Sequence, residues 1–151
     1  MDEVIEVKVA RTHQDALLPT KGSVHAAGWD LYSLEDTVVK RRSSTMVRTG
    51  LHVAIPEGYE GQVRARSSLG KKGLILPHSI GTIDADYRGE LFVLMTWIGE
   101  GDSYLIQKNE RIAQLVREKK IEGIKDILSL IHISEPTRRT PISYAVFSLK
   151  K

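Results

Sequence analysis

The sequence predicts an all-β protein built as one domain. Short segments rich in β-branched and aromatic residues recur along the chain, and we expect strands at 4–10, 45–55, 91–98 and 103–107. Glycine and proline separate these segments at the short intervals typical of all-β domains. No window of helical length keeps a continuous apolar stripe. With 151 residues the chain can bury one core, but it is too short for a second domain of ordinary size.

The composition excludes several classes of protein. Cysteine is absent, so this chain has neither disulfides nor thiolate metal sites. No apolar run approaches the roughly 20 residues of a membrane span. Acidic residues occur at the N-terminal end, where a secretory signal would be basic and apolar. We therefore expect a cytoplasmic protein without a membrane partner.

The net charge of +3 resides in the C-terminal tail. Residues 128–151 contain four of the 22 basic residues and one of the 19 acidic residues, so the rest of the chain has 18 of each sign. The body of the chain is electrically balanced, and the basic pI of about 9.2 does not indicate a nucleic-acid partner.

The segment Gly81–Glu90, GTIDADYRGE, places two carboxylates, a tyrosine and an arginine on a glycine-bounded turn. Asp84 and Asp86 share one face of an extended segment, whereas a turn after Ile83 directs them differently. Asp and Gly also collect in ordinary hairpin turns. Alone, this segment indicates either a hairpin turn or a catalytic carboxylate.

One short helix is expected to begin near Ser67 or Ser68, either of which could cap it. Unpaired backbone N–H groups at a helix start attract anions, especially beside cations such as Lys71 and Lys72. The segment indicates either a phosphate-binding element or a surface turn with solvated lysines.

Four segments in this order resemble the first four sequence motifs of the trimeric dUTP pyrophosphatases, or dUTPases. They are Ala27–Leu31, Arg66–Gly70, Gly81–Glu90 and Glu110–Gln114, and the resemblance covers residues 1 to about 125. It implies a jelly-roll β-fold, a β-clip barrel, in a homotrimer. Motifs one, two and four would come from one chain, motif three from a second and motif five from a third.

The resemblance also implies an activity and its partners. A dUTPase hydrolyses dUTP to dUMP and pyrophosphate by Mg²⁺-assisted attack of water on the α-phosphorus. The expected partners are therefore dUTP, Mg²⁺ and two further copies of the chain, with no nucleic-acid polymer.

The resemblance assigns roles to individual residues. Asp84 would activate the attacking water. The ring of Tyr87 would pack against the deoxyribose and leave no room for a 2′-hydroxyl. Ser67 would donate to the oxygen that bridges the α- and β-phosphates, with the N–H of Ser68 beside it.

Three further roles follow from the resemblance. Arg66 would brace the site or an interface, and Gln114 would contact the phosphates. Asp30 would order the hydration shell of the metal or a neighbouring arginine.

Uracil would be read by the backbone of a hairpin at 76–81, which includes His78 and Gly81 and continues to Ile83. Many relatives have Asn at the position of His78, so the expected contacts are those of the backbone. The other histidines show no metal-ligand spacing, and we assign none of them to catalysis: His13, His25, His52 and His132.

The chain departs from the family pattern at two places. Asn109–Glu110 replaces the usual Gly-Asp of motif four, which keeps the charge on a longer side chain. No glycine follows Gly123, so the fifth motif, of the form RGxGGFGS, is absent. Residues 128–151 resemble out-of-frame or adapter-derived coding sequence. We expect a dUTPase-like domain at 1–127, a non-native tail at 128–151 and impaired activity, because no segment closes over the nucleotide.

Two alternative functions stay open. The dCTP deaminases share the fold and an Arg-Ser-Ser segment, but they place a phenylalanine at the position of Tyr87 and a catalytic glutamate on the next strand. Residues 91–95 contain no acid, which disfavours deamination. The other alternative is a non-catalytic trimeric nucleotide-binding or regulatory homologue.

Overall fold

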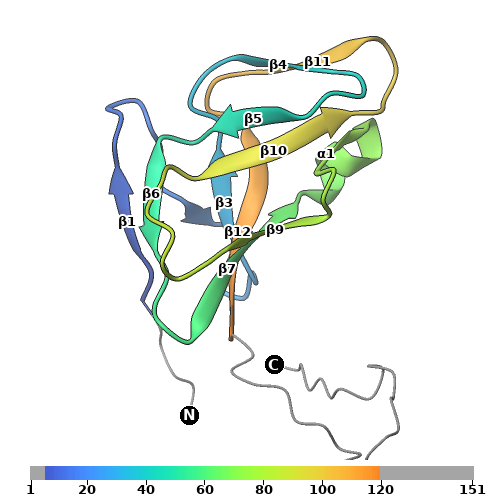
Figure 1. Ribbon diagram of the computed structural model, residues 1–151. Coiled ribbons are helices and arrows are strands. Elements are labelled where there is room, and N and C mark those ends of the chain that lie inside the picture. The colour runs from blue at the N-terminus through green and yellow to red at the C-terminus, as the bar shows by residue number, and fades with distance from the viewer. Residues whose placement is uncertain (1–5, 120–151) are drawn as a thin grey trace, which may run out of the picture. The chain divides into compact units, whose positions relative to one another are not determined.

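The computed structural model describes residues 6–119, which form twelve strands and one short helix (Figure 1). The prediction of an all-β fold is confirmed. The elements in chain order are β1 (Lys8–Arg11), β2 (Thr20–Lys21), β3 (Trp29–Tyr32), β4 (Thr37–Lys40), β5 (Thr45–Arg48), β6 (Leu51–Ala54), β7 (Tyr59–Ala65), α1 (Ser67–Lys72), β8 (Leu74–Ile75), β9 (Ile80–Ile83), β10 (Phe92–Trp97), β11 (Ser103–Ile106) and β12 (Arg111–Lys119).

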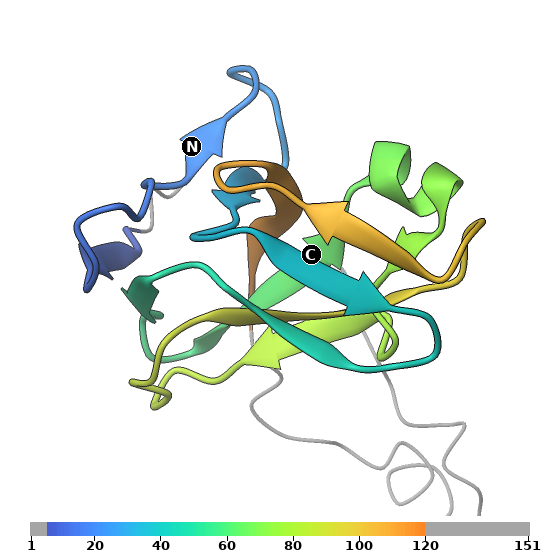
Figure 2. The same cartoon turned by 90° about the horizontal axis from the view of Figure 1, so that it is seen from above.

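The strands form four small sheets, in which segments distant in the sequence lie side by side. The largest has five strands in the order β2-β3-β12-β7-β9, and a three-stranded sheet has the order β5-β10-β8. Two further pairs are β1 with β6 and β4 with β11, and Figure 2 shows the second pair from above. The strand pairs with a described register are antiparallel. Because the order of strands in the sheets differs from their order in the chain, the four motif segments lie on different strands and turns of the fold.

The core is built from alternate residues of these strands. On β6 and over Phe92–Met95 of β10, every second side chain points inward, as the two-residue period of a strand requires. The last residues of β10, Met95 to Trp97, are all buried. The fully buried side chains include Leu31, Val39, Val47, Leu51, Val93, Met95, Ile106 and Ile112. Burial of their apolar surface is the main favourable contribution to folding.

The predicted strand at 45–55 is wrong in its middle, because β5 and β6 are separate strands. The chain turns at Thr49 and Gly50. Gly50 has a φ of 71°, which side chains other than glycine adopt rarely, and a Cβ there would lie 2.9 Å from Cβ of Ala16. The Thr49 hydroxyl is buried and donates to the carbonyl of Leu91 at 2.6 Å. This turn therefore depends on contacts with distant segments.

The other expected strands fit in part. β1 begins at Lys8, so residues 6–7 of the strand expected from residue 4 are not in a strand, and residues 4–5 lie outside the described residues. β10 and β11 occupy the segments predicted at 91–98 and 103–107. No helix among the described residues is long and apolar enough to cross a membrane. The boundary expected at 127/128, the tail and the missing fifth motif lie outside the described residues.

Candidate functional site

Motifs one and four form neighbouring strands. Asp30 on β3 and Gln114 on β12 are cross-strand partners. Gly28 allows this close approach, because a Cβ at that position would lie 3.0 Å from Val116 Cγ2 and 3.1 Å from the carbonyl oxygen of Leu115. The structure thus brings Asp30 and Gln114 together, as the resemblance implies.

Arg111 connects this strand pair to motif two. Its Nη1 lies 3.4 Å from Oδ2 of Asp30, whose side chain is 12% exposed, while the arginine side chain is 50% exposed. Arg66 donates from Nη1 to the carbonyl oxygen of Arg111 at 3.3 Å. A buried carboxylate therefore holds an exposed guanidinium at this corner. The sequence reasoning did not assign Arg111 a role, although its place between Glu110 and Gln114 was a usable signal.

Helix α1 presents Ser67 and Ser68 in its first turn, and both residues are exposed. The prediction that one of these serines caps the helix is wrong. The N-cap residue is Arg66, which makes no side-chain capping bond. Leu69 anchors the helix in the core, and Gly73 ends it with a φ of 111°. Ser67 and Ser68 thus stand beside the corner built by Asp30 and Arg111.

The predicted uracil hairpin is a turn between β8 and β9. Ser79 has a φ of 69°, and the N–H of Ile80 donates to the carbonyl of His78 at 2.7 Å. The ring of His78 lies over Gly81, where a Cβ would be 3.1 Å from Nε2. The side chain of Ile83 is buried in the core, so a contact between Ile83 and substrate is limited to its backbone.

The segment between β9 and β10 forms a tight turn that presents Asp84 and Tyr87. The N–H of Tyr87 donates to the carbonyl of Asp84 at 3.0 Å, and both side chains are exposed. The Tyr87 hydroxyl donates to the carbonyl of Glu90 at 2.7 Å. Its ring lies over Gly89, where a Cβ would be 2.6 Å from the phenolic oxygen. The turn predicted after Ile83 is present.

A partly buried ion pair supports this turn. Arg48 on β5 donates to both carboxylate oxygens of Glu90, from Nε at 3.1 Å and from Nη2 at 3.0 Å. The N–H of Gly50 adds a third bond at 3.0 Å. Partial burial raises the pKa of the Glu90 carboxyl. The bonds from Arg48 and Gly50 and the nearby positive charge outweigh burial, so the net pKa lies below its ordinary value.

The sequence reasoning missed this pair. Arg48 and Glu90 are 42 positions apart in the chain. Nothing in the sequence around Arg48 distinguishes it from the other basic residues on strands. Only the pairing of β5 with β10 brings the two side chains together.

Within one chain, the Asp84 turn and the Ser67 corner lie at opposite ends of a strand ladder. β7 pairs antiparallel with β9, with Gly61 opposite Ile83 and Arg64 opposite Ile80. Ser67 follows one end of this ladder and Asp84 follows the other. Seven residues at about 3.3 Å each correspond to a separation of about 20 Å. Figures 1 and 2 show α1 and the segment between β9 and β10 on opposite sides.

The substitution in motif four has a local structural role. Asn109 has a φ of 70°, a conformation that asparagine adopts more readily than most residues. The Glu110 carboxylate accepts bonds from the N–H of Gln107 at 2.9 Å and from the hydroxyl of Tyr104 at 2.7 Å. Glu110 therefore stabilises the turn that leads into β12. Partial burial, together with the hydrogen bond to the neighbouring Glu110 carboxylate and its negative charge, raises the pKa of Tyr104 to about 12.

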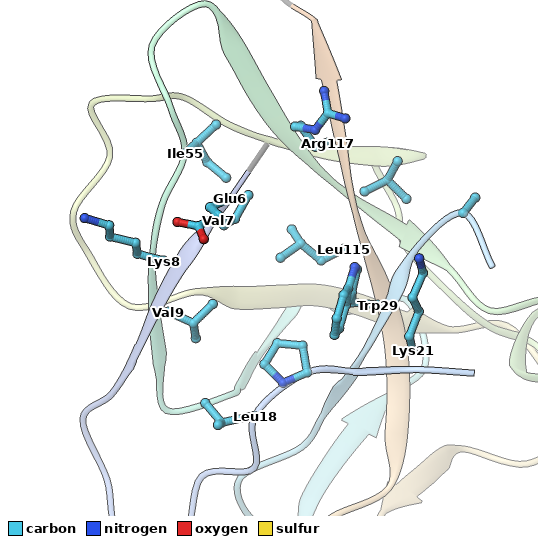
Figure 3. Close-up of a pocket in the computed structure, with 13 residues that line it drawn as sticks. Glu6, Val7, Lys8, Val9, Leu18, Lys21, Trp29, Ile55, Leu115 and Arg117 are labelled. Atoms are coloured by element: carbon cyan, nitrogen blue, oxygen red, sulfur yellow. The ribbon is translucent and has the colours of Figure 1, made fainter. Parts of the chain in front are cut away.

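One groove among the described residues is lined by none of the predicted site residues. It has a cavity volume of about 650 Å³. Figure 3 shows Val9 of β1 and Val7, which precedes β1, on one side and Trp29 and Leu115 on the other. Ala27 and Trp29 of motif one line this groove, whereas Asp30 does not. A second groove, of about 760 Å³, is lined by Lys71 and Lys72 at the end of α1, but not by Ser67 or Ser68. Neither groove is lined by a predicted site residue.

The dUTPase family's sequence model matches residues 14–141. A deoxyuridine 5′-triphosphate nucleotidohydrolase of Syntrophotalea carbinolica is 50% identical over 117 residues, which cover 76% of this chain and 79% of that protein.

Solved structures show the same similarity. The dUTPase from phage phi11 of S. aureus has a TM-score of 0.70 at 23% identity, covering 79% of this chain and 93% of that one, which shows a shared fold. A dUTPase variant of Staphylococcus bacteriophage 80alpha with bound dUpNHpp has a TM-score of 0.67 at 26% identity, covering 80% and 94%.

Proposed function

The chain belongs to the dUTPase family, and we propose that it hydrolyses dUTP to dUMP and pyrophosphate. The observation that carries this proposal is the distribution of the motif residues. Asp30, Arg66 and Gln114 gather beside Ser67 at one corner, and Asp84 with Tyr87 stands on an exposed turn at the other end of the β7–β9 ladder. A second copy can bring these two halves together.

In this proposal Asp84 orients and deprotonates the water that attacks the α-phosphorus. A general base must lie within hydrogen-bond reach of the proton it removes. The exposed position of Asp84 on the turn suits contact with a nucleotide held by another chain. Tyr87, three residues later, would stand against the sugar of the same nucleotide and exclude a 2′-hydroxyl.

The phosphates would bind at the opposite corner. The Ser67 hydroxyl and the Ser68 N–H would donate to the oxygen that leaves with pyrophosphate, where negative charge grows in the transition state. The exposed guanidinium of Arg111, held by Asp30, supplies a positive charge beside them. Gln114 adds an amide donor, and Arg66 positions the carbonyl of Arg111.

The residues of one chain fit a cation that arrives with the substrate. Among the described residues, no group of three or more His, Asp or Glu side chains could hold a metal ion. Mg²⁺ commonly binds substrate phosphates and water with few protein ligands. When bound, Mg²⁺ neutralises the charge of the triphosphate. Asp30 would order its hydration shell together with Arg111.

We further propose that the active unit is a homotrimer with shared sites. The test mixes two inactive chains, one with Asp84→Asn and one with Ser67→Ala, and refolds them together. In a random mixture about one site in four combines both intact residues, so hydrolysis should recover in the mixture. Recovery requires that Asp84 and Ser67 of one site come from different chains. A mixture as inactive as either parent contradicts shared sites.

The hydrolysis itself is tested by pyrophosphate release from dUTP with Mg²⁺. Asp84→Asn should abolish release, while Asp86→Asn, in the same turn, is the matched control and should keep it. Calorimetry with dUpNHpp measures binding independently of turnover. Binding without release supports the non-catalytic alternative. A wild-type chain that neither binds dUpNHpp nor releases pyrophosphate contradicts the proposed function.

A further inference from the structure

The position of the Tyr87 ring depends on few contacts. The side chain is 41% exposed, and its hydroxyl is held by the carbonyl of Glu90 at 2.7 Å. The inner side of the ring rests on Gly89, with no space for a Cβ between them. Since solvent covers the outer side, the ring stands where the backbone of residues 89 and 90 places it.

The carboxylate of Glu90 fixes that backbone to a different part of the chain. Two nitrogens of Arg48 reach its two oxygens, and the N–H of Gly50 reaches Oε2. Paired bonds of a guanidinium to a carboxylate restrict orientation as well as distance. The Glu90 side chain is 14% exposed, so water competes weakly for these three bonds.

Neighbouring bonds attach the residues on either side. His52 Nδ1 lies 2.8 Å from the carbonyl oxygen of Arg88, and the N–H of Leu91 donates to the carbonyl of Leu51 at 2.8 Å. These bonds hold the peptide before Gly89 and the residue after Glu90. The side-chain bonds of Glu90 fix the position of Glu90 itself, and its backbone carbonyl accepts the hydrogen bond from the Tyr87 hydroxyl.

We propose that Glu90 and Arg48 are positioning residues for sugar specificity. By fixing the carbonyl that holds Tyr87, the pair determines how closely the phenol ring approaches C2′ of the nucleotide. This inference rests on the proposed function, in which Tyr87 excludes the 2′-hydroxyl. A pocket that can yield discriminates weakly against an added hydroxyl, so exclusion of the ribose requires a rigid ring.

The test replaces Glu90 with an isosteric neutral side chain. In Glu90→Gln, the amide NH₂ would face donors of Arg48 or Gly50, so at least one of the three bonds is lost. Arg48→Lys is a milder variant that keeps the charge but removes the paired bonds. Glu100→Gln is the matched control, because Glu100 is exposed on the turn between β10 and β11.

The measurement is calorimetric binding of dUpNHpp and of its ribose counterpart UpNHpp, both with Mg²⁺. The ratio of the two dissociation constants reports sugar specificity. We expect Glu90→Gln to reduce the ratio about tenfold, equivalent to about 1.4 kcal/mol, and Arg48→Lys to reduce it less. Glu100→Gln should keep the wild-type ratio. Circular dichroism melts of the same proteins separate loss of fold from loss of specificity.

Each outcome discriminates. A Glu90→Gln protein that melts earlier but keeps the wild-type ratio would have lost a structural contact only, which overturns the inference. If it is too unstable to measure, an unchanged ratio in Arg48→Lys overturns the inference equally. If the wild-type protein binds both analogues equally, Tyr87 does not exclude the 2′-hydroxyl. This result overturns the inference but does not contradict the proposed hydrolysis of dUTP. Wild-type protein that binds neither refutes the proposed function itself and the inference with it.

Discussion

Replacing Gly89 with alanine should change sugar specificity while leaving the fold intact. A Cβ at this position would lie 2.6 Å from the oxygen, 2.8 Å from Cζ and 3.1 Å from Cε1 of Tyr87. Ordinary contacts between carbon atoms are about 3.5–4.0 Å, so the ring must move by about 1 Å. The φ of Gly89 lies outside the left-handed region, so alanine can adopt the backbone without strain.

The stability of this variant should remain close to that of the wild type. Displacement of the ring weakens the bond from the Tyr87 hydroxyl to the Glu90 carbonyl, which contributes about 0.5–1.5 kcal/mol. Alanine reduces the conformational freedom of the unfolded chain, which stabilises by about 0.4–1 kcal/mol. The two effects nearly cancel. We therefore expect a melting temperature within a few degrees of the wild-type value.

Specificity should respond far more than stability. A misplacement of about 1 Å at a reacting centre can reduce the rate about 100-fold. We expect the discrimination between dUTP and UTP, measured as the ratio of kcat/KM or of analogue binding, to fall at least tenfold. Gly22→Ala is the control, because a Cβ at Gly22 meets nothing within 4 Å. If Gly89→Ala kept both its melting temperature and its discrimination, the ring would not be positioned by Gly89 and the reasoning would be refuted.

Three further changes test the fold around the site. Gly73→Ala should destabilise by about 3 kcal/mol or more in urea unfolding, because φ is 111° and a Cβ would lie 2.4 Å from the Gly99 nitrogen; an unchanged midpoint would contradict this. Leu31→Ala should lower the unfolding free energy by about 2–5 kcal/mol, since Leu31 is fully buried; a loss below 1 kcal/mol would show that the site collapses around the cavity. The pKa of Glu90 is lowered by folding, so its contribution is complete above its ordinary pKa and is lost as pH falls through the lower folded value. The stability difference between wild type and Glu90→Gln should therefore shrink from about pH 5 downward, and a constant difference would contradict the role of the ionised carboxylate.

Local sequence signals predicted the fold class well but the strand boundaries poorly. The segments at 91–98 and 103–107 match β10 and β11 because short apolar runs rich in β-branched and aromatic residues, bounded by glycine and other turn residues, favour strands. Gly50 is a local signal for the break between β5 and β6, but the predicted strand ran through it; the structure shows that Gly50 turns there and packs against Ala16. β7 and β12 were not expected as strands, because Arg, Glu and Gln interrupt their apolar residues.

In the candidate site too, features set by neighbouring residues were predicted, whereas features set by contacts between distant residues were not. The turn at Asp84–Tyr87 follows from Asp and Gly within one short segment, and the structure contains it. The helix cap was predicted wrongly: the N-cap residue is Arg66, whose side chain makes no capping bond and instead donates to the carbonyl of Arg111, 45 positions later. Interactions across such separations depend on the order of strands in the sheet, which local propensity does not encode.

The proposed division of the site between chains rests on the stiffness of one strand pair. Ser67 and Asp84 are attached to opposite ends of the β7–β9 ladder, and the backbone bonds of that ladder fix their separation at about 20 Å. Movement of a turn by a few ångströms cannot close this distance. The Asp84 turn is moreover tied to β5 and β6 through Glu90 and Leu91, which restricts its reach further. A single folded chain is therefore unable to bring the proposed base to the proposed phosphate site. If the chemistry occurs, assembly must precede it, and the rigidity that prevents a site within one chain also positions both halves for a neighbour.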